Sequence, residues 1–148
     1  MEGAGVAYDL VIFESPAHKA TQAAELLRCP LGAIVKSLVF RGGITGKLVL
    51  VLVSGENRAD PRRLTAIFGE PVQPAKPGDV LSEAGYPVGA VPPFALAGDF
   101  PVLIDADIMA QDQVWAAAGS AHVLFGIRPE DLVSLSGGQS VELKLEDT

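Results

Sequence analysis

The sequence predicts a mixed α/β domain over residues 1–148, and three observations carry that prediction. Apolar runs of strand length occupy residues 34–40 and 48–53, where Val, Ile, Leu and Phe favour a pleated, buried strand. Ser15-Pro16 and Asp60-Pro61 each place a capping side chain before a proline, which is typical of a helix start. The expected strands do not alternate regularly with helices, so a uniformly parallel sheet is not predicted.

The first half of the chain is expected to form a strand, a helix and a β-hairpin. A glycine-rich turn at residues 41–46 separates two strands, which predicts that they pair antiparallel. The second of these strands is apolar on both faces and is therefore expected near the centre of the sheet. The expected elements are a strand at 6–13, a helix at 21–28, and strands at 34–40 and 47–53.

The second half is expected to contain shorter elements. The helix that begins at Asp60-Pro61 runs through Phe68 to Gly69, a residue type that ends helices readily. A last segment, at residues 141–145, either adds an edge strand or stays mobile. The other expected elements are a helix at 79–84, strands at 100–105, 113–117 and 122–127, a turn or short helix at 107–111, and a helix beginning at 128–132.

Lys36 is the unusual residue of the strand at 34–40. Side chains alternate along a strand, so Lys36 shares one face with Ile34, Leu38 and Phe40. An unpaired ammonium would be costly to bury among three large apolar neighbours. Either Lys36 reaches water and protects a sheet edge against aggregation, or that face opens onto a cavity that requires a cation.

Composition and charge exclude several classes of protein. The net charge of −7 argues against general nucleic-acid binding, and we expect no DNA partner. Nine of the eleven Lys and Arg residues lie in residues 1–76, which carry a charge of +2, whereas residues 77–148 carry −9. No apolar run is long enough for a membrane span and the start lacks a signal sequence, so we expect a cytoplasmic protein without a membrane partner. The single cysteine, Cys29, excludes an intramolecular disulfide.

Motifs of familiar chemistry are missing from the sequence. It has no phosphate-binding loop, no GxSxG turn and no HExxH helix. Asp105 and Asp107 with His122 are candidate ligands of a metal-dependent hydrolase, although the favoured interpretation of the two aspartates is that they are solvated loop carboxylates. Two loops are candidate binding sites. Prolines stiffen the first, and small residues leave backbone N–H groups accessible in the second. They are the loop at 85–94 and the small-residue loop at 118–121.

An ordered set of motifs resembles a known family. The set is P-A-H-x-A from Pro16, A-A-E-L-L from Ala23, I-V-K-S-L-V-F from Ile34, G-Y-P-V-G-A-V-P-P-F from Gly85, V-L-I-D from Val102 and A-A-G-S-A-H from Ala117. Together, over roughly residues 16–135, they resemble the YbaK-type family of free-standing aminoacyl-tRNA deacylases. The same fold occurs as the editing insertion of bacterial prolyl-tRNA synthetases.

The resemblance implies a mixed, largely antiparallel β-sheet flanked by helices, and hydrolysis of the ester that joins a wrong amino acid to the tRNA 3′ end. It points to tRNA(Pro) carrying alanine or cysteine, with prolyl-tRNA synthetase as a candidate partner and with no metal or other cofactor. By position, Lys36 matches the family's strand lysine near the terminal adenosine, and Gly89 begins its GxxxP loop. The remaining residues carried over as substrate-binding are Ala90, Val91, Pro92, Pro93, Ala118, Gly119, Ser120 and His122.

Two departures from the family pattern bear on this expectation. Many relatives carry a helix before the first strand, which this sequence does not show, and some have a serine near Ala117, a place that Ser120 could take. The alternative function is a non-catalytic module that binds a nucleotide, an aminoacyl-adenosine or a synthetase. That alternative predicts binding without turnover, whereas a metal-dependent hydrolase predicts loss of activity with a chelator.

Overall fold

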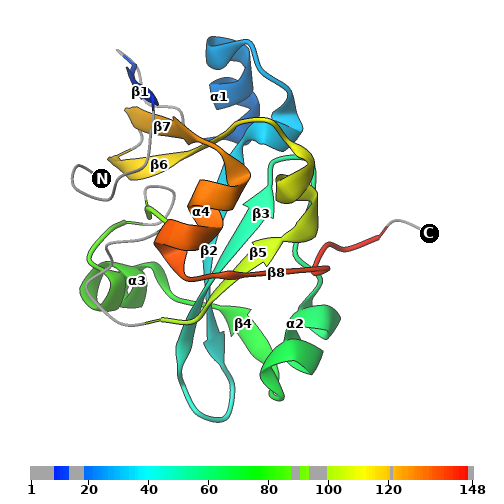
Figure 1. The fold of residues 1–148 in the computed structure, drawn as a ribbon. Helices are drawn as coiled ribbons and strands as arrows, with labels where there is room; N and C mark the ends of the chain where they lie inside the picture. The colour runs from blue at the N-terminus through cyan, green and yellow to red at the C-terminus, as the bar shows by residue number, and fades with distance from the viewer. Residues whose placement is uncertain (1–8, 14–18, 88–90, 94–99, 121, 147–148) are drawn as a thin grey trace.

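The computed structural model describes residues 9–13, 19–87, 91–93, 100–120 and 122–146, and its strands form two sheets (Figure 1). One sheet has the order β4-β2-β3-β5-β8 and the other the order β1-β7-β6. The pairs β3-β5 and β5-β8 are parallel and the other pairs of these sheets antiparallel, so the expected mixed, largely antiparallel arrangement is confirmed. The strands are β1 (Asp9–Ile12), β2 (Val35–Gly42), β3 (Leu48–Ser54), β4 (Val72–Pro74), β5 (Val102–Asp105), β6 (Val114–Ser120), β7 (Val123–Ile127) and β8 (Gln139–Val141).

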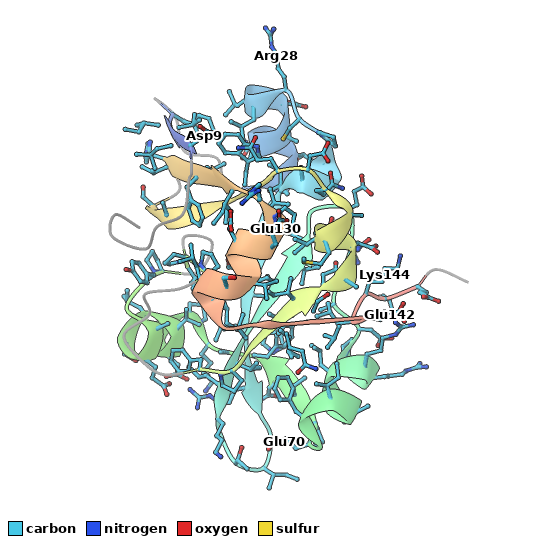
Figure 2. The ribbon with its side chains drawn as sticks, viewed as in Figure 1. Asp9, Arg28, Glu70, Glu130, Glu142 and Lys144 are labelled. Carbon is cyan, nitrogen blue, oxygen red and sulfur yellow. The ribbon has the colours of Figure 1, made fainter. Side chains whose placement is uncertain are left out.

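The expected β-hairpin is confirmed as β2 and β3, which pair from Val35 opposite Ser54 to Arg41 opposite Leu48. Every residue of β3 is buried, in agreement with its central place between β2 and β5. The hairpin turn is closed by Glu70, whose Oε1 accepts hydrogen bonds from the backbone N–H of Thr45 at 3.0 Å and of its neighbour Ile44. Figure 2 shows Glu70 beside this hairpin at the bottom of the view.

The helix α2 begins and ends where capping chemistry places it. The Asp60 carboxylate accepts the backbone N–H of Arg62 at 2.9 Å, and Gly69 ends the same helix in the left-handed conformation. The Ser15-Pro16 helix start lies outside the described residues. No helix in the described ranges has the length and apolar character needed to cross a bilayer. The helices are α1 (Ala20–Leu27), α2 (Pro61–Phe68), α3 (Pro77–Ala84) and α4 (Pro129–Ser136), with 3-10 turns η1 (Leu31–Ala33) and η2 (Ala106–Ala110).

Among the described residues, three apolar cores hold these elements together. The largest lies between one face of the five-stranded sheet and a layer made of α3, α4 and the strands β6 and β7. The second packs α2 on the opposite face of that sheet, through Leu64 and Phe68. The third packs α1 against β7, through Ala23 and Leu124. Because Ile34 joins this third core and bridges to Trp115 of β6, the residue before β2 connects the two sheets.

Two sequence-based boundaries are wrong. Residues 118–120 were expected in a loop but belong to β6, which pairs with β7 across a register shift between Ala117 and Ser120. Small residues permit this bulge, and Gly119 has a φ of 95°, which other residues rarely adopt. The last strand, β8, comes earlier than the expected segment at 141–145 because it pairs in parallel with the end of β5.

Candidate active site

A hollow of about 650 Å³ lies where the two sheets meet, beside the first half of β2. Its walls come from the start of α1, from β2, from the loop that follows β3, and from β6 and β7. Ile34, Ala117 and Leu124 provide apolar wall. We refer to it as the Lys36 hollow. Its polar and charged lining residues include Lys19, Lys36, Ser37, Glu56, Asn57 and Arg58.

The Lys36 side chain is half-buried in this hollow, and its Nζ donates a hydrogen bond to the backbone carbonyl of Asn57. Burial lowers the pKa of Lys36, the nearby Arg58 guanidinium lowers it further, and the Asp105 carboxylate acts in the opposite direction. Within the described part of the chain, no carboxylate forms an ion pair with Lys36 or Arg58. Two cations side by side in a concave surface favour an anionic ligand.

The loop that holds the Lys36 ammonium is itself fixed by Asp105. This carboxylate is 1% exposed and lies at the end of β5. Its Oδ2 accepts the backbone N–H of Ser54 at 3.1 Å and the Asn57 Nδ2 at 2.8 Å. Its Oδ1 accepts the backbone N–H of Asp107 at 3.1 Å. Asp105 therefore positions Asn57, and the Asn57 carbonyl in turn positions Lys36.

Asp107 continues this network towards the surface. It accepts the Asn57 Nδ2 at 2.9 Å and the Lys144 Nζ at 2.9 Å, and these two hydrogen bonds, the one from Asn57 first, lower the pKa of the Asp107 carboxyl. Figure 2 shows Lys144 on the C-terminal segment beyond β8. The interpretation of Asp105 and Asp107 as solvated loop carboxylates is thus wrong for Asp105, which is buried and hydrogen-bonded.

The residues considered for a metal site do not assemble. In the described ranges no group of three or more His, Cys, Asp or Glu side chains could hold a metal ion. His122 is exposed, and its Nδ1 lies 3.2 Å from the carbonyl oxygen of Phe13 at the β1 end of the smaller sheet. Asp105 and Asp107 instead bind Asn57, so the trio predicted for a metal-dependent hydrolase is not formed.

The loop expected to position the ester is described only in its second half. Gly89 and Ala90 lie outside the described residues. Val91, Pro92 and Pro93 are buried, and Val91 lies in the largest apolar core. Val91 also lines a second, smaller hollow of about 160 Å³, which shares Ser37 and its neighbour Leu38 with the Lys36 hollow.

The other expected site residues surround the end of β6. Ala118 is exposed, and the Ser120 Oγ accepts the backbone N–H of His122 at 3.1 Å. Gly119 lies against the Tyr86 ring, where an added Cβ would be 3.0 Å from Cε1. None of these residues is among those that line the Lys36 hollow, where β6 contributes Ala117. Their roles remain predictions from the resemblance.

Sequence reasoning missed the loop that follows β3. Glu56, Asn57 and Arg58 line the Lys36 hollow, and Asn57 joins Lys36 to Asp105. One signal was present: Ser54 and Gly55 follow the apolar run at 48–53, and polar residues at the end of a buried strand commonly form sites. Gly55 has a steric reason as well, because an added Cβ would lie 2.4 Å from the Leu31 carbonyl oxygen.

Two packed sheets with a cationic hollow between them agree with the aminoacyl-tRNA deacylase class that the sequence motifs resemble. The model of the aminoacyl-tRNA editing domain family matches residues 14–135. The chain therefore belongs to the aminoacyl-tRNA editing domain family.

Individual relatives agree with this assignment. A crystal structure described as "a putative trans-editing enzyme for prolyl tRNA synthetase" superposes with a TM-score of 0.88 at 36% identity, over 94% of this chain and 87% of that one. The uncharacterized protein YwhH of Bacillus subtilis is 31% identical over 86% of this chain and 81% of its own length. The "Putative Cys-tRNA(Pro)/Cys-tRNA(Cys) deacylase EbsC" of Enterococcus faecalis is 27% identical over 86% of this chain and 78% of its own length.

Part of a synthetase is similar as well. The proline–tRNA ligase of Desulfovibrio desulfuricans is 34% identical over 110 residues, which are 72% of this chain and 18% of the ligase. The similarity thus extends to one segment of a much longer enzyme.

Proposed function

We propose that this protein hydrolyses the ester bond of mischarged tRNA, acting on tRNA(Pro) that carries alanine or cysteine. The observation that supports this most strongly is the half-buried Lys36 ammonium, held by the Asn57 carbonyl in a hollow that also contains Arg58. A cationic hollow suits the anionic 3′ end of an RNA. Such an enzyme acts where translation takes place, in the cytoplasm.

In this proposal Lys36 contacts the terminal adenosine and its phosphate and thereby places the ester in the hollow. Backbone groups of the loop at 89–93 position the ester and the attacking water. Ester hydrolysis requires neither a side-chain nucleophile nor a metal when donors stabilise the oxyanion and the reacting groups are well placed. A ribose hydroxyl beside the ester can assist the water, so the chemistry needs no Ser-His-Asp set.

The choice of amino acid and tRNA rests on the relatives. The name of EbsC specifies Cys-tRNA(Pro), and the trans-editing relative is named for prolyl-tRNA synthetase. We propose prolyl-tRNA synthetase as the partner that delivers the mischarged tRNA, because an acidic chain with a net charge of −7 binds phosphates weakly on its own. Alanine and cysteine differ little in size, and a methylene-sized difference is worth about 1–3 kcal/mol.

The test is release of amino acid from a panel of mischarged tRNAs, beginning with Ala-tRNA(Pro) and Cys-tRNA(Pro). We expect turnover by the wild-type protein that is insensitive to a chelator. We expect Lys36→Ala to abolish it with the fold intact, whereas Lys47→Ala, which removes an exposed lysine, should keep the wild-type rate. The circular dichroism spectrum and thermal midpoint of each variant check its fold.

Three outcomes would count against the proposal. Near-normal turnover by Lys36→Ala would show that Lys36 is not needed for the reaction. Loss of activity with a chelator would favour a metal-dependent hydrolase. Binding of an aminoacyl-adenosine analogue by a folded protein that turns over no member of the panel would favour the non-catalytic module.

A further inference from the structure

Ser37 has a buried hydroxyl without a hydrogen-bond partner in the part of the chain that the structure describes, and no other buried side-chain polar atom there is in that state. A buried hydroxyl that makes no hydrogen bond costs about 1–3 kcal/mol relative to one that is paired. Buried polar groups are nearly always satisfied in folded proteins, so such an exception points to a ligand or to a catalytic role.

Ser37 belongs to the lining of two hollows. Ser37 lines both the Lys36 hollow and the neighbouring hollow of about 160 Å³, which we refer to as the small hollow. The small hollow is otherwise apolar, with Val39, Val80 and Val91 among its lining residues. An engineered cavity of about 150 Å³ holds benzene, so this volume accommodates a small aliphatic or thiol side chain.

The backbone groups of Ser37 point away from β3. Alternate residues of a strand direct their N–H and C=O groups to opposite sides. The Ile34 carbonyl accepts Gly55 N–H at 2.7 Å on the β3 side, and the Val39 carbonyl accepts Ala75 N–H at 2.9 Å on the β4 side. Ser37, two residues from Val39, therefore directs its backbone groups to the β4 side. There β4 pairs with Phe40, Arg41 and Gly42, so its ladder stops short of Ser37.

We propose that Ser37 is a further catalytic residue, whose hydroxyl donates a hydrogen bond to the carbonyl oxygen of the aminoacyl ester. The ester then lies where the two hollows meet, with the RNA end beside Lys36 and the amino-acid side chain in the small hollow. This inference rests on the proposed function and adds to it one hydrogen-bond donor, the Ser37 hydroxyl of β2.

The hydroxyl acts on the oxygen that gains negative charge during hydrolysis. Water adds to the ester carbon, the carbonyl oxygen becomes an oxyanion, and the Ser37 Oγ–H stabilises it. The bond from that carbon to the ribose oxygen then breaks, and the ribose oxygen takes one proton of the water. The products are the free amino acid, which loses its remaining acidic proton to solvent, and tRNA with its terminal hydroxyl restored.

The test compares Ser37→Ala, Ser37→Thr and the exposed-site control Ser134→Ala on the mischarged tRNA that the wild-type protein hydrolyses best. We expect Ser37→Ala to lower kcat by about 10²-fold with little change in KM, because loss of one oxyanion donor costs about 10²–10³. Ser37→Thr restores a hydroxyl and should stay within about threefold of the wild type. Ser134→Ala, on the exposed face of α4, should leave kcat unchanged.

Thermal unfolding separates this role from a structural one. Because the hydroxyl has no partner among the described residues, Ser37→Ala should keep or raise the melting temperature, whereas loss of a structural hydrogen bond would lower it. Wild-type kcat in Ser37→Ala, or a lowered kcat with a lowered melting temperature that Ser37→Thr does not restore, would overturn the inference and leave the proposed function standing. No turnover by the wild type on any tRNA would overturn both.

Discussion

Replacing Asp105 with alanine should destabilise the protein by about 3–5 kcal/mol, because three donors lose their acceptor at once. The carboxylate is 1% exposed. It accepts the backbone N–H of Ser54 at 3.1 Å, the side-chain amide of Asn57 at 2.8 Å and the backbone N–H of Asp107 at 3.1 Å. The bonds from Ser54 and Asn57 fix the loop after β3, which carries the carbonyl that holds Lys36, and the bond from Asp107 caps η2.

The magnitude follows from how deeply each donor is buried. A buried donor left without an acceptor costs about 1–3 kcal/mol. The Ser54 N–H is fully enclosed and takes the upper part of that range, whereas Asn57 and Asp107 are partly exposed and can turn towards water. The sum is a large share of the roughly 5–15 kcal/mol that stabilises a domain. Asp105→Asn keeps one oxygen that can accept the Ser54 N–H, so it should lower the free energy of unfolding by about half as much as Asp105→Ala.

Urea denaturation measures this loss, with Asp112→Ala as the matched control. Asp112 is an exposed aspartate in the turn after η2, and its removal should change the free energy of unfolding by less than about 0.5 kcal/mol. Amide hydrogen exchange at Ser54 should accelerate in Asp105→Ala. A loss in Asp105→Ala below about 1 kcal/mol, or an equal loss in Asp112→Ala, would refute the assignment of Asp105 as the support of this loop.

Two further predictions concern the hollow and the bulge in β6. Burial and Arg58 lower the pKa of Lys36, so the folded protein releases this proton before the unfolded chain does, and the wild type should gain stability as the pH rises from the lowered pKa towards about 10.4. Lys36→Met should lack this gain in unfolding titrations at alkaline pH, and parallel curves for the two proteins would contradict the lowered pKa. Gly119→Ala should destabilise by about 1–3 kcal/mol, because φ is 95° and the new Cβ would lie 3.0 Å from Tyr86 Cε1. Thermal unfolding checks it, and an unchanged melting temperature would show that the bulge accepts a side chain.

Local patterns were sufficient for much of the fold. Two apolar runs separated by a glycine-rich turn predicted an antiparallel hairpin, and the structure contains it as β2 and β3. Asp60-Pro61 and Gly69 marked both ends of α2, because capping and left-handed backbone depend on neighbours in the sequence. The expectation for residues 118–120 failed because small residues are typical of loops, whereas pairing with β7 continues the strand.

By itself the sequence determined the strand that carries Lys36, the helix ends and, through its ordered motifs, the editing-domain family. Only the tertiary structure decided that the strands divide into two sheets, that Asp105 supports Asn57 from 48 positions away, and that the buried Ser37 hydroxyl has no partner among the described residues. The physical reason is the range of the interactions. Side-chain periodicity and capping act over a few residues, whereas the enclosure of a carboxylate or a hydroxyl depends on segments that only folding brings together.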